Sequence, residues 1–253
     1  MNAIFDAAKQ WIERIAGCRI YRASLPHGTD CFFDIHRRFG RDRIRVAFDV
    51  GANNGKSALT YLREFPRAEI YSFEPVASTY RQLVASTQAF SRVHAYNLGL
   101  GREPGVTTIN VNPDSQLSSI GLNRPGSHTE SIQIDTLAGF VAKHQMESID
   151  FLKIDTEGFD MEVLAGASPL LQQQRIHLIL CECEPVVRTR NFVDLATLAE
   201  FLSRFGYEFF GVYEQQPDWG GRNELLFWNG LFVCKKLVAP GANLPNGVCT
   251  GPQ

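Results

Sequence analysis

The chain has 253 residues, 44% hydrophobic and 21% charged, so it can bury one sizeable core and is short for two complete domains. Its formal net charge of -2 argues against a general nucleic-acid binder, which needs clustered Lys and Arg to displace counterions from phosphates. The six cysteines form no Cys-x-x-Cys pair, and Cys181 and Cys183 alternate with acids in an apolar run. This pattern indicates buried thiols in a reducing compartment rather than a disulfide framework or a zinc site.

The first 44 residues precede the main pattern of strands and helices. Residues 1–17 space apolar side chains at helical period among charges, which predicts an amphipathic helix too charged for a signal peptide. No apolar run is long enough to span a bilayer, so we expect a cytoplasmic protein. The basic run at 37–45 fits either a solvated connector or a rim that attracts an anionic substrate. We expect 1–44 to be a helical extension that serves as a lid or substrate region.

From residue 45 the chain alternates short apolar runs with helical periods, which predicts an open, mainly parallel α/β sheet with helices on both faces. Ligands of such sheets bind at the C-terminal ends of the strands. The domain should span 45–237, and the Pro- and Gly-rich tail at 238–253 should be disordered. The predicted strands are 45–50, 69–75, 92–97, 149–155, 176–185, 208–213 and 225–236, and the predicted helices are 56–65, 78–90, 160–173 and 195–205.

Residues 98–134 depart from this alternation. The segments 105–112 and 131–134 are strand-like, and the stretch between them is polar and rich in turn residues. The plain interpretation is a hairpin-like insertion with a mobile tip.

The stretch FDVGANNGKS at 48–57 ends in Gly-Lys-Ser, the three residues that close a phosphate-binding loop. An ATP loop needs four residues between its glycines, but only three separate Gly51 from Gly55. A dinucleotide loop needs a second glycine where Asn53 stands. The remaining pattern suits the carboxylate and ammonium of S-adenosylmethionine, with Asp49 placed to orient the ammonium or the loop. Of Asn53 and Asn54, either one could face the cofactor while the other caps the helix.

Two polar residues end the next two predicted strands. Glu74 lies about one strand-helix-strand unit beyond Gly51, where a carboxylate can accept hydrogen bonds from both ribose hydroxyls. A helix-capping or surface role is the alternative. Asn97 ends the third strand, where its amide fits either an adenine edge or a simple turn.

The segment IDFLKIDTEGFDMEVLAGA at 149–167 places Lys153, Asp155 and Glu157 in alternation as a buried strand leaves the sheet. Three ionisable groups are costly to desolvate there without a purpose, so they form a site candidate. Together with VAFDVGANNGKSA at 46–58, SFEP at 72–75 and SIQIDTLAGF at 131–140, this segment resembles the FkbM family of S-adenosylmethionine-dependent O-methyltransferases.

The resemblance covers about 45–236 and implies the Rossmann-like class I methyltransferase fold, a seven-stranded sheet whose last strand is antiparallel. It implies that Glu74 contacts the ribose of the cofactor and that Asp155 forms the floor between cofactor and acceptor. Asp160 stands where the family usually has Glu, which leaves the role of that position open. The residues implied to contact the methionine end are Gly51, Ala52, Asn53 and Gly55.

Methyl transfer to a hydroxyl requires an aligned acceptor and removal of its proton. Asp155 is the first candidate to position the hydroxyl or take the proton. Lys153 either holds Asp155 ionised or is paired away in a structural network. Glu182 and Glu184, at the end of the neighbouring strand, either bind the acceptor or pair with nearby arginines.

Other interpretations stay open at this point. Asp155 and Glu182 could together grip a divalent ion such as Mg²⁺, although no metal-ligand motif is present. His128, in the insertion, could swing in as a base, whereas His94 and His177 lie at strand starts and fit structural roles.

The expected function is methyl transfer to a hydroxyl of a sugar, glycan, polyketide or other polyhydroxylated natural product, and this acceptor class rests on the resemblance alone. The alternative is a binding module that kept the cofactor fold but lost catalysis. Calorimetry with S-adenosylmethionine, followed by turnover assays, separates the two. The sequence does not determine the oligomeric state.

Overall fold

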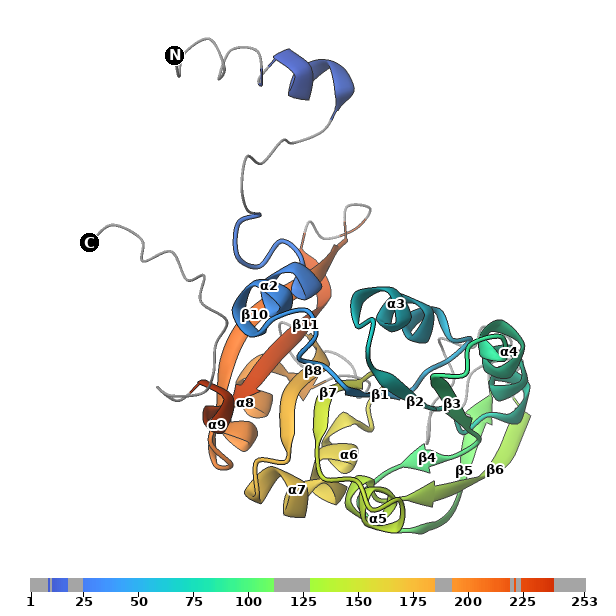
Figure 1. Ribbon diagram of the computed structural model, residues 1–253. Coiled ribbons are helices and arrows are strands. Elements are labelled where there is room, and N and C mark those ends of the chain that lie inside the picture. The colour runs from blue at the N-terminus through green and yellow to red at the C-terminus, as the bar shows by residue number, and fades with distance from the viewer. Residues whose placement is uncertain are drawn as a thin grey trace.

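The computed structural model describes residues 9, 11–17, 25–111, 128–184, 193–218, 221 and 224–238 (Figure 1). Its centre is one mixed sheet in the order β10-β11-β8-β7-β1-β2-β3, with the short β9 paired to β8. All pairs are parallel except those that β11 makes with β8 and β10. The strands are β1 (Val46–Val50), β2 (Glu69–Phe73), β3 (Val93–Tyr96), β7 (Ile149–Ile154), β8 (Ile176–Glu184), β9 (Val193–Asp194), β10 (Tyr207–Pro217) and β11 (Leu225–Cys234).

This topology confirms the predicted Rossmann-like α/β fold with an antiparallel last strand. The strand count differs slightly, because β9 adds an eighth strand to the seven expected. β9 has only two residues, and no apolar run announces so short a strand.

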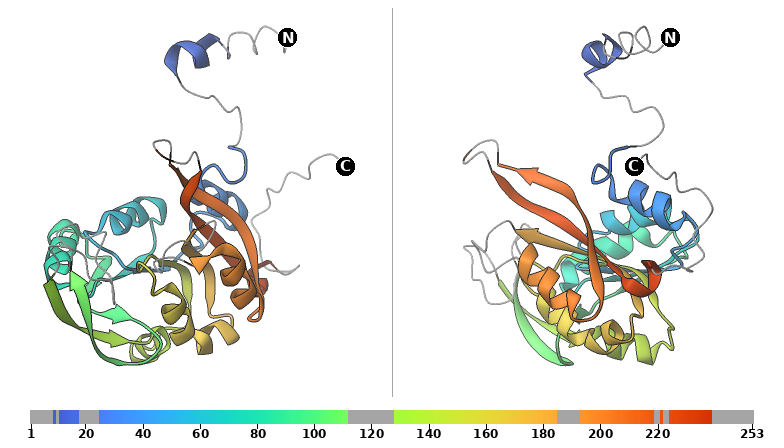
Figure 2. Two further views of the ribbon diagram at one scale, coloured as in Figure 1. Left: turned by 180° about the vertical axis from the view of Figure 1, so that it is seen from behind. Right: turned by 90° about the vertical axis from the view of Figure 1, so that its left-hand side faces the viewer.

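Helices cover both faces of the sheet (Figures 1 and 2). On one face Phe151 of β7 contacts Phe32 of α2 and Tyr61 of α3. On the other face Phe48 of β1 contacts Phe140 of α5. The helices are α2 (Cys31–Phe39), α3 (Lys56–Glu64) and α4 (Ala77–Thr87) on the first face, α5 (Leu137–Lys143), α6 (Asp160–Gly166), α7 (Ser168–Gln172) and α8 (Leu195–Ser203) on the second, and the terminal α9 (Lys235–Val238).

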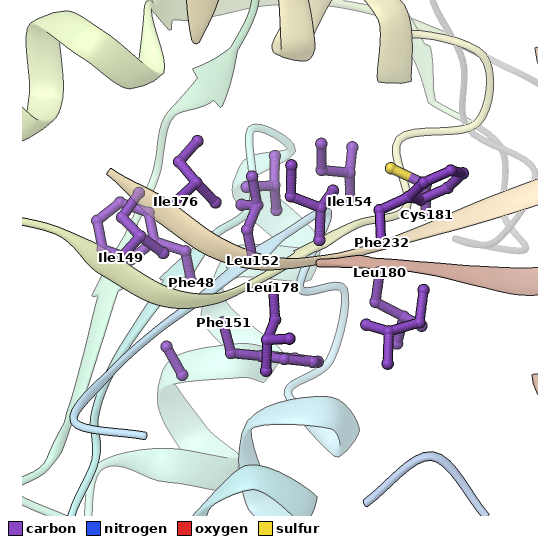
Figure 3. Packing of buried hydrophobic residues seen from close by; sticks show 14 of the residues in the cluster. Phe48, Ile149, Phe151, Leu152, Ile154, Ile176, Leu178, Leu180, Cys181 and Phe232 are labelled. Carbon is purple, nitrogen blue, oxygen red and sulfur yellow. The ribbon is translucent and has the colours of Figure 1, made fainter. Parts of the chain in front are cut away.

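The central strands are buried on both sides, as their continuous apolar runs predict. Phe151 and Leu180 point to the face covered by α2 and α3, whereas Leu152 and Cys181 point to the opposite face (Figure 3). Odd-numbered residues of β7 therefore share a face with even-numbered residues of β8. This alternation decides which polar side chains meet at the ends of the strands.

The insertion forms a separate three-stranded sheet in the order β4-β6-β5, from β4 (Gly99–Leu100), β5 (Gly105–Val111) and β6 (His128–Asp135). β5 and β6 pair antiparallel, so the predicted hairpin-like arrangement is confirmed. Its predicted mobile tip, at 112–127, lies outside the described residues.

Two predictions differ from the structure. The helix expected over 160–173 is two helices, α6 and α7, because Pro169 lies in the first turn of α7 and cannot continue a helix from α6. The basic run at 37–45 is in part helical, since it begins in the last turn of α2. α2 buries Cys31, Ile35 and Phe39 against the main core, and Asp30 caps its first turn.

The ends of the chain are described only in part. Residues 11–16 are helical, with Trp11 and Ile15 about two-thirds exposed. Most of the tail expected at 238–253 lies outside the described residues, so the division into extension, domain and tail stays a prediction. No helix in the described part of the chain is long and apolar enough to cross a membrane. The described cysteines, at 31, 181, 183 and 234, are buried free thiols, as predicted.

Candidate active site

The carboxyl ends of the parallel strands β1, β2, β7 and β8 meet at one edge of the sheet, and the predicted site residues gather there. β10 and β11 extend beyond this edge and wall it on one side (Figure 2). The arginines that open the domain lie at the opposite edge, where Arg45 precedes β1 and its amide donates to Asp150.

The loop after β1 is packed closely against the end of β7. The amides of Gly51 and Ala52 both donate to the carbonyl of Phe73, at 3.0 and 2.9 Å. Gly51 has φ of +83°, and a Cβ placed there would stand 1.8 Å from the backbone oxygen of Asp155. Only glycine fits, because both the backbone angle and the contact exclude a side chain. The loop is therefore fixed at the carboxyl edge, where it leads into the N-terminus of α3, a position that favours a small anionic group.

The second half of the loop leads into α3. Asn53 adopts φ of +48°, a left-handed conformation that asparagine tolerates. Gly55, which has no side chain to make a capping bond, is the N-cap of α3. The backbone carbonyl of Asn54 accepts a bond from the hydroxyl of Ser86, at 2.7 Å. The division of roles between Asn53 and Asn54 stays a prediction.

Glu74 lies directly after β2 and is buried. Its Oε2 accepts from the amide of Asn53 at 3.0 Å, and its Oε1 accepts from the amide of Val76 at 2.9 Å. Burial raises the pKa of Glu74 to about 7, although both backbone bonds act in the opposite direction. A carboxylate offers about four lone-pair sites, so it can hold the loop and still accept ligand hydroxyls.

Asn97 follows β3 and is exposed. Its Nδ2 donates to the carbonyls of Glu74 and Pro75, at 3.0 and 2.8 Å. The side-chain amide of Asn97 thus fixes the end of β2, which agrees with the structural role in a turn that was one of its two predicted roles. A contact between Asn97 and an adenine stays a prediction.

A charged pair occupies the end of β7. The ammonium of Lys153 lies 2.5 Å from Oδ2 of Asp155. Burial favours the neutral form of Lys153, but the attraction of Asp155 and Asp49 outweighs it and raises the pKa of this ammonium. Lys153 therefore stays charged and fixes the position of Asp155.

Asp49, on the neighbouring β1, faces the same pair. It is fully buried, and its Oδ2 has no hydrogen-bond partner among the described residues. Burial raises the pKa of Asp49 to about 7, against the attraction of Lys153. A buried oxygen without a donor suits a ligand that brings an ammonium or a hydroxyl.

Two acids end β8. Cys181 pairs with Ile154, so Glu182 comes level with Asp155. Burial, followed by the charge of Asp155, raises the pKa of Glu182 to about 9, so this carboxyl is protonated at neutral pH. Glu184 is also buried at this edge.

Asp160, where the family resemblance has Glu, opens α6 and is buried. Its Oδ1 accepts a long bond of 3.4 Å from the amide of Thr156. Burial and the charge of Asp155 raise the pKa of Asp160 to about 6. The shorter acid thus stays near Asp155 but contacts the turn that follows β7.

The histidines are not gathered at this edge. His94 contacts Glu69 at 2.8 Å, and His177 contacts Asp150 at 2.9 Å, both near the starts of strands. His128 is the exposed first residue of β6, and its role as a base stays a prediction.

Three further residues stand at the site without any advance signal in the sequence. Tyr61 of α3 lies near Asp49, and burial, followed by that charge, raises the pKa of its phenol. Asn229 of β11 pairs with Glu182 across the sheet, and its amide donates to Glu214 of β10. The positions of Asn229 and Glu214 depend on strand register and on a bulge, which no local motif marks.

Comparison with known proteins agrees with this geometry. The model of the protein family described as "Methyltransferase FkbM domain" matches residues 49–209, which is more than half of the chain. This chain belongs to the FkbM methyltransferase family. It is accordingly an S-adenosylmethionine-dependent methyltransferase, as the glycine loop, Glu74 and the strand order had indicated.

Several known proteins are similar in sequence to part of this FkbM chain. "Methyltransferase 1" of Beauveria bassiana is 28% identical over 68% of the chain and 74% of its own length. "Hexuronic acid methyltransferase AglP" of Haloferax volcanii is 26% identical over 61% of the chain and 62% of its own length. "2-O-methyltransferase NoeI" of Sinorhizobium fredii is 22% identical over 51% and 60%. The last two relatives are therefore matched over less than two-thirds of their own length.

Among solved structures, the magnesium protoporphyrin IX methyltransferase of Synechocystis PCC 6803 has a TM-score of 0.43 and 11% identity, over 76% of this chain and 70% of its own. The METTL16 methyltransferase domain has a TM-score of 0.47 and 12% identity, over 89% and 65%. The fold assignment of the FkbM chain rests on its own strand order, described above.

Proposed function

We propose that the chain is an O-methyltransferase that methylates a hydroxyl of a sugar or another small polyhydroxylated molecule. The observation that carries the proposal is the Lys153–Asp155 pair, 2.5 Å apart, beside the buried carboxyl of Glu182. The pair stands directly behind the glycine loop, since Gly51 touches the backbone of Asp155. The carboxylate of Asp155, held in place by the ammonium of Lys153 next to the cofactor loop, is suited to take a proton from a hydroxyl.

We assign the cofactor to the groups that border this loop. The N-terminus of α3, which begins directly after Gly55, suits the carboxylate of S-adenosylmethionine, and the buried, unpartnered Oδ2 of Asp49 suits its ammonium. Glu74 keeps lone pairs for the ribose hydroxyls, and Asn97 would lie at the adenine.

When bound, S-adenosylmethionine supplies a methyl group on a positively charged sulfur. The acceptor oxygen gains this methyl group and loses its proton, which we assign to the carboxylate of Asp155. Lys153 binds the carboxylate of Asp155 before the transfer and stays charged after it. The protonated Glu182 is a donor rather than a base, and it can orient the acceptor.

The acceptor class is supported by the names of two relatives, a hexuronic acid methyltransferase and a 2-O-methyltransferase. We propose a small-molecule acceptor rather than a nucleic acid, in line with the net charge of -2. A cytoplasmic location is likewise a proposal, supported by the buried free thiols.

A divalent ion between Asp155 and Glu182 is the less favoured variant of this function. The ammonium of Lys153 already occupies the neighbourhood of Asp155. Among the described residues, no group of three or more His, Cys, Asp or Glu side chains is arranged to hold a metal. We therefore expect full activity after exhaustive chelation, and activity that returns only on addition of Mg²⁺ would reverse this preference.

Calorimetry with S-adenosylmethionine and with S-adenosylhomocysteine tests the cofactor assignment. A screen of hydroxylated acceptors, read by formation of S-adenosylhomocysteine, then tests methyl transfer. We expect binding of both ligands and turnover that depends on the acceptor. Absence of binding would contradict the proposal, whereas binding without turnover on any acceptor would favour an inactive cofactor-binding module.

A further inference from the structure

A β-bulge in β10 changes the direction of Glu214. Between the pairs Tyr213–Asn229 and Gln216–Phe227, two residues of β10 stand opposite one residue of β11. Glu214 is the first of these two, and it has φ of +51°. A left-handed glutamate is uncommon, and bulges of this kind redirect side chains beside active sites.

The bulge brings Glu214 to the face of the sheet that carries Tyr213. In a regular strand the two side chains would point to opposite faces. Here the phenol of Tyr213 donates to Asp34 of α2 at 3.0 Å, and Nδ2 of Asn229, the partner of Tyr213, donates to Oε2 of Glu214 at 2.5 Å. Because the carboxylate of Glu214 can only accept a hydrogen bond, the nitrogen of the Asn229 amide must face it. The oxygen of the same amide therefore points away from Glu214.

That amide oxygen is unused within the protein. Oδ1 of Asn229 is buried and has no hydrogen-bond partner among the described residues, and Asn229 as a whole is 5% exposed. A buried acceptor without a donor is costly, so it needs an explanation. Asn229 stands opposite Glu182, which is level with Asp155, so a ligand beside Asp155 is within reach of this oxygen.

We infer that Asn229, Glu214 and Glu182 form the acceptor-binding wall of the site and that they select a neutral sugar or polyol. This inference rests on the proposed function. One acceptor hydroxyl donates to Oδ1 of Asn229, and another donates to the carboxylate of Glu214. The carboxyl of Glu182 donates to an acceptor oxygen. Paired donors and acceptors of this kind recognise adjacent hydroxyl groups.

The charge around the wall disfavours an acidic acceptor. Asp155 and Glu214 bring carboxylates to this edge, beside the carboxyl of Glu182. Among the described residues, the cation packed into this cluster is Lys153, and Asp155 already binds its ammonium. A uronic acid would add another negative charge to this cluster, and a neutral sugar would not.

Saturation-transfer NMR on protein saturated with S-adenosylhomocysteine tests the inference. The probes are the methyl glycosides of neutral hexoses and of the matching hexuronic acids. We expect saturation transfer to the neutral glycosides and much weaker transfer to the uronic acids. No transfer to any neutral glycoside, or equal transfer to both sets, overturns the inference while the proposed function stands. If S-adenosylhomocysteine itself does not bind, the proposed function fails first.

Two variants and one control locate the interaction. Asn229→Leu should weaken neutral glycoside binding by at least ~10-fold, because it removes the amide oxygen at similar volume. Glu214→Gln keeps an acceptor for Asn229 but removes the negative charge. The difference in binding between neutral glycosides and uronic acids should therefore become smaller. Gln215→Ala, in the same bulge, should change neither. Affinity for S-adenosylhomocysteine should be equal in all three variants, and an unchanged preference in Glu214→Gln counts against the inference.

Discussion

Lys153 and Asp155 lie two residues apart at the end of β7, with ammonium and carboxylate 2.5 Å from each other. Lys153 lies on the face of β7 that α2 and α3 cover, and Asp155 follows the strand directly, with its carboxylate on that ammonium. Asp49 and Glu182 reach the same place from the strands on either side. One cation thus organises acids that arrive from three strands.

Asp155→Asn should lower kcat by at least ~100-fold, the scale expected for loss of a general base, with little change in S-adenosylhomocysteine affinity. The unfolding free energy should also fall, because the buried ammonium of Lys153 loses its carboxylate partner. Steady-state kinetics, thermal unfolding and calorimetry measure the three quantities. Asp150→Ala, at the other end of β7, is the matched control. It removes bonds to the amides of Arg45 and Val46, so it should reduce stability by about 1–3 kcal/mol and leave kcat unchanged. An active Asp155→Asn enzyme removes Asp155 from the mechanism.

Lys153→Met should destabilise the protein more at pH 8 than at pH 5. The pKa of Lys153 is raised above its ordinary value, so Lys153 itself does not titrate in this range. In the wild type the charge of Lys153 lowers the pKa values of Asp49 and Glu182, so the variant raises the pKa values of these two acids. The native state of the variant then binds more protons than the native state of the wild type. The unfolding free energy of the variant therefore falls further below that of the wild type as pH rises.

Denaturant unfolding at the two pH values measures this difference. We expect a loss of about 3 kcal/mol or more at pH 8, as for other broken buried pairs, and a clearly smaller loss at pH 5. Lys143→Met, at the exposed end of α5, is the control and should behave like the wild type at both values. A loss that does not depend on pH shows that packing, not charge, is the role of Lys153.

Glu74→Ala should weaken S-adenosylmethionine binding by about 1–3 kcal/mol through loss of bonds to the ribose. It also leaves the amides of Asn53 and Val76 without their acceptor, so the unfolding free energy should fall. Glu74→Gln separates the two effects, because it keeps one acceptor oxygen for the loop. Calorimetry on both variants is the measurement, and unchanged affinity in Glu74→Ala shows that this acid does not bind the cofactor.

Gly51→Ala should prevent stable folding or cost more than ~4 kcal/mol. Its Cβ would stand 1.8 Å from the backbone oxygen of Asp155, at a φ of +83° that alanine avoids. Gly105→Ala is the matched control, since nothing lies within 4 Å of a Cβ there. Thermal unfolding of the two variants checks the contrast, and a stable Gly51→Ala protein means that the loop can move away from β7.

Local patterns predicted most of the sheet. Continuous apolar runs marked β1, β7 and β8 because such strands are buried on both faces. The division of the helix after β7 at Pro169 and the cap of α2 by Asp30 were not predicted, although both residue types mark helix starts. β9 carries no comparable signal, since two residues cannot show a period.

By itself, the sequence determined the fold class, the methyltransferase family, the glycine loop and the acids that end each strand. These features depend on residues that lie close together in the chain. The tertiary structure decided which of those acids meet, because parallel register alone sets Asp49, Asp155 and Glu182 side by side. It also decided the acceptor wall, where Asn229 and a bulged Glu214 arrive from an antiparallel hairpin. A bulge and a pairing register are properties of two strands together, so neither strand shows them in its own sequence.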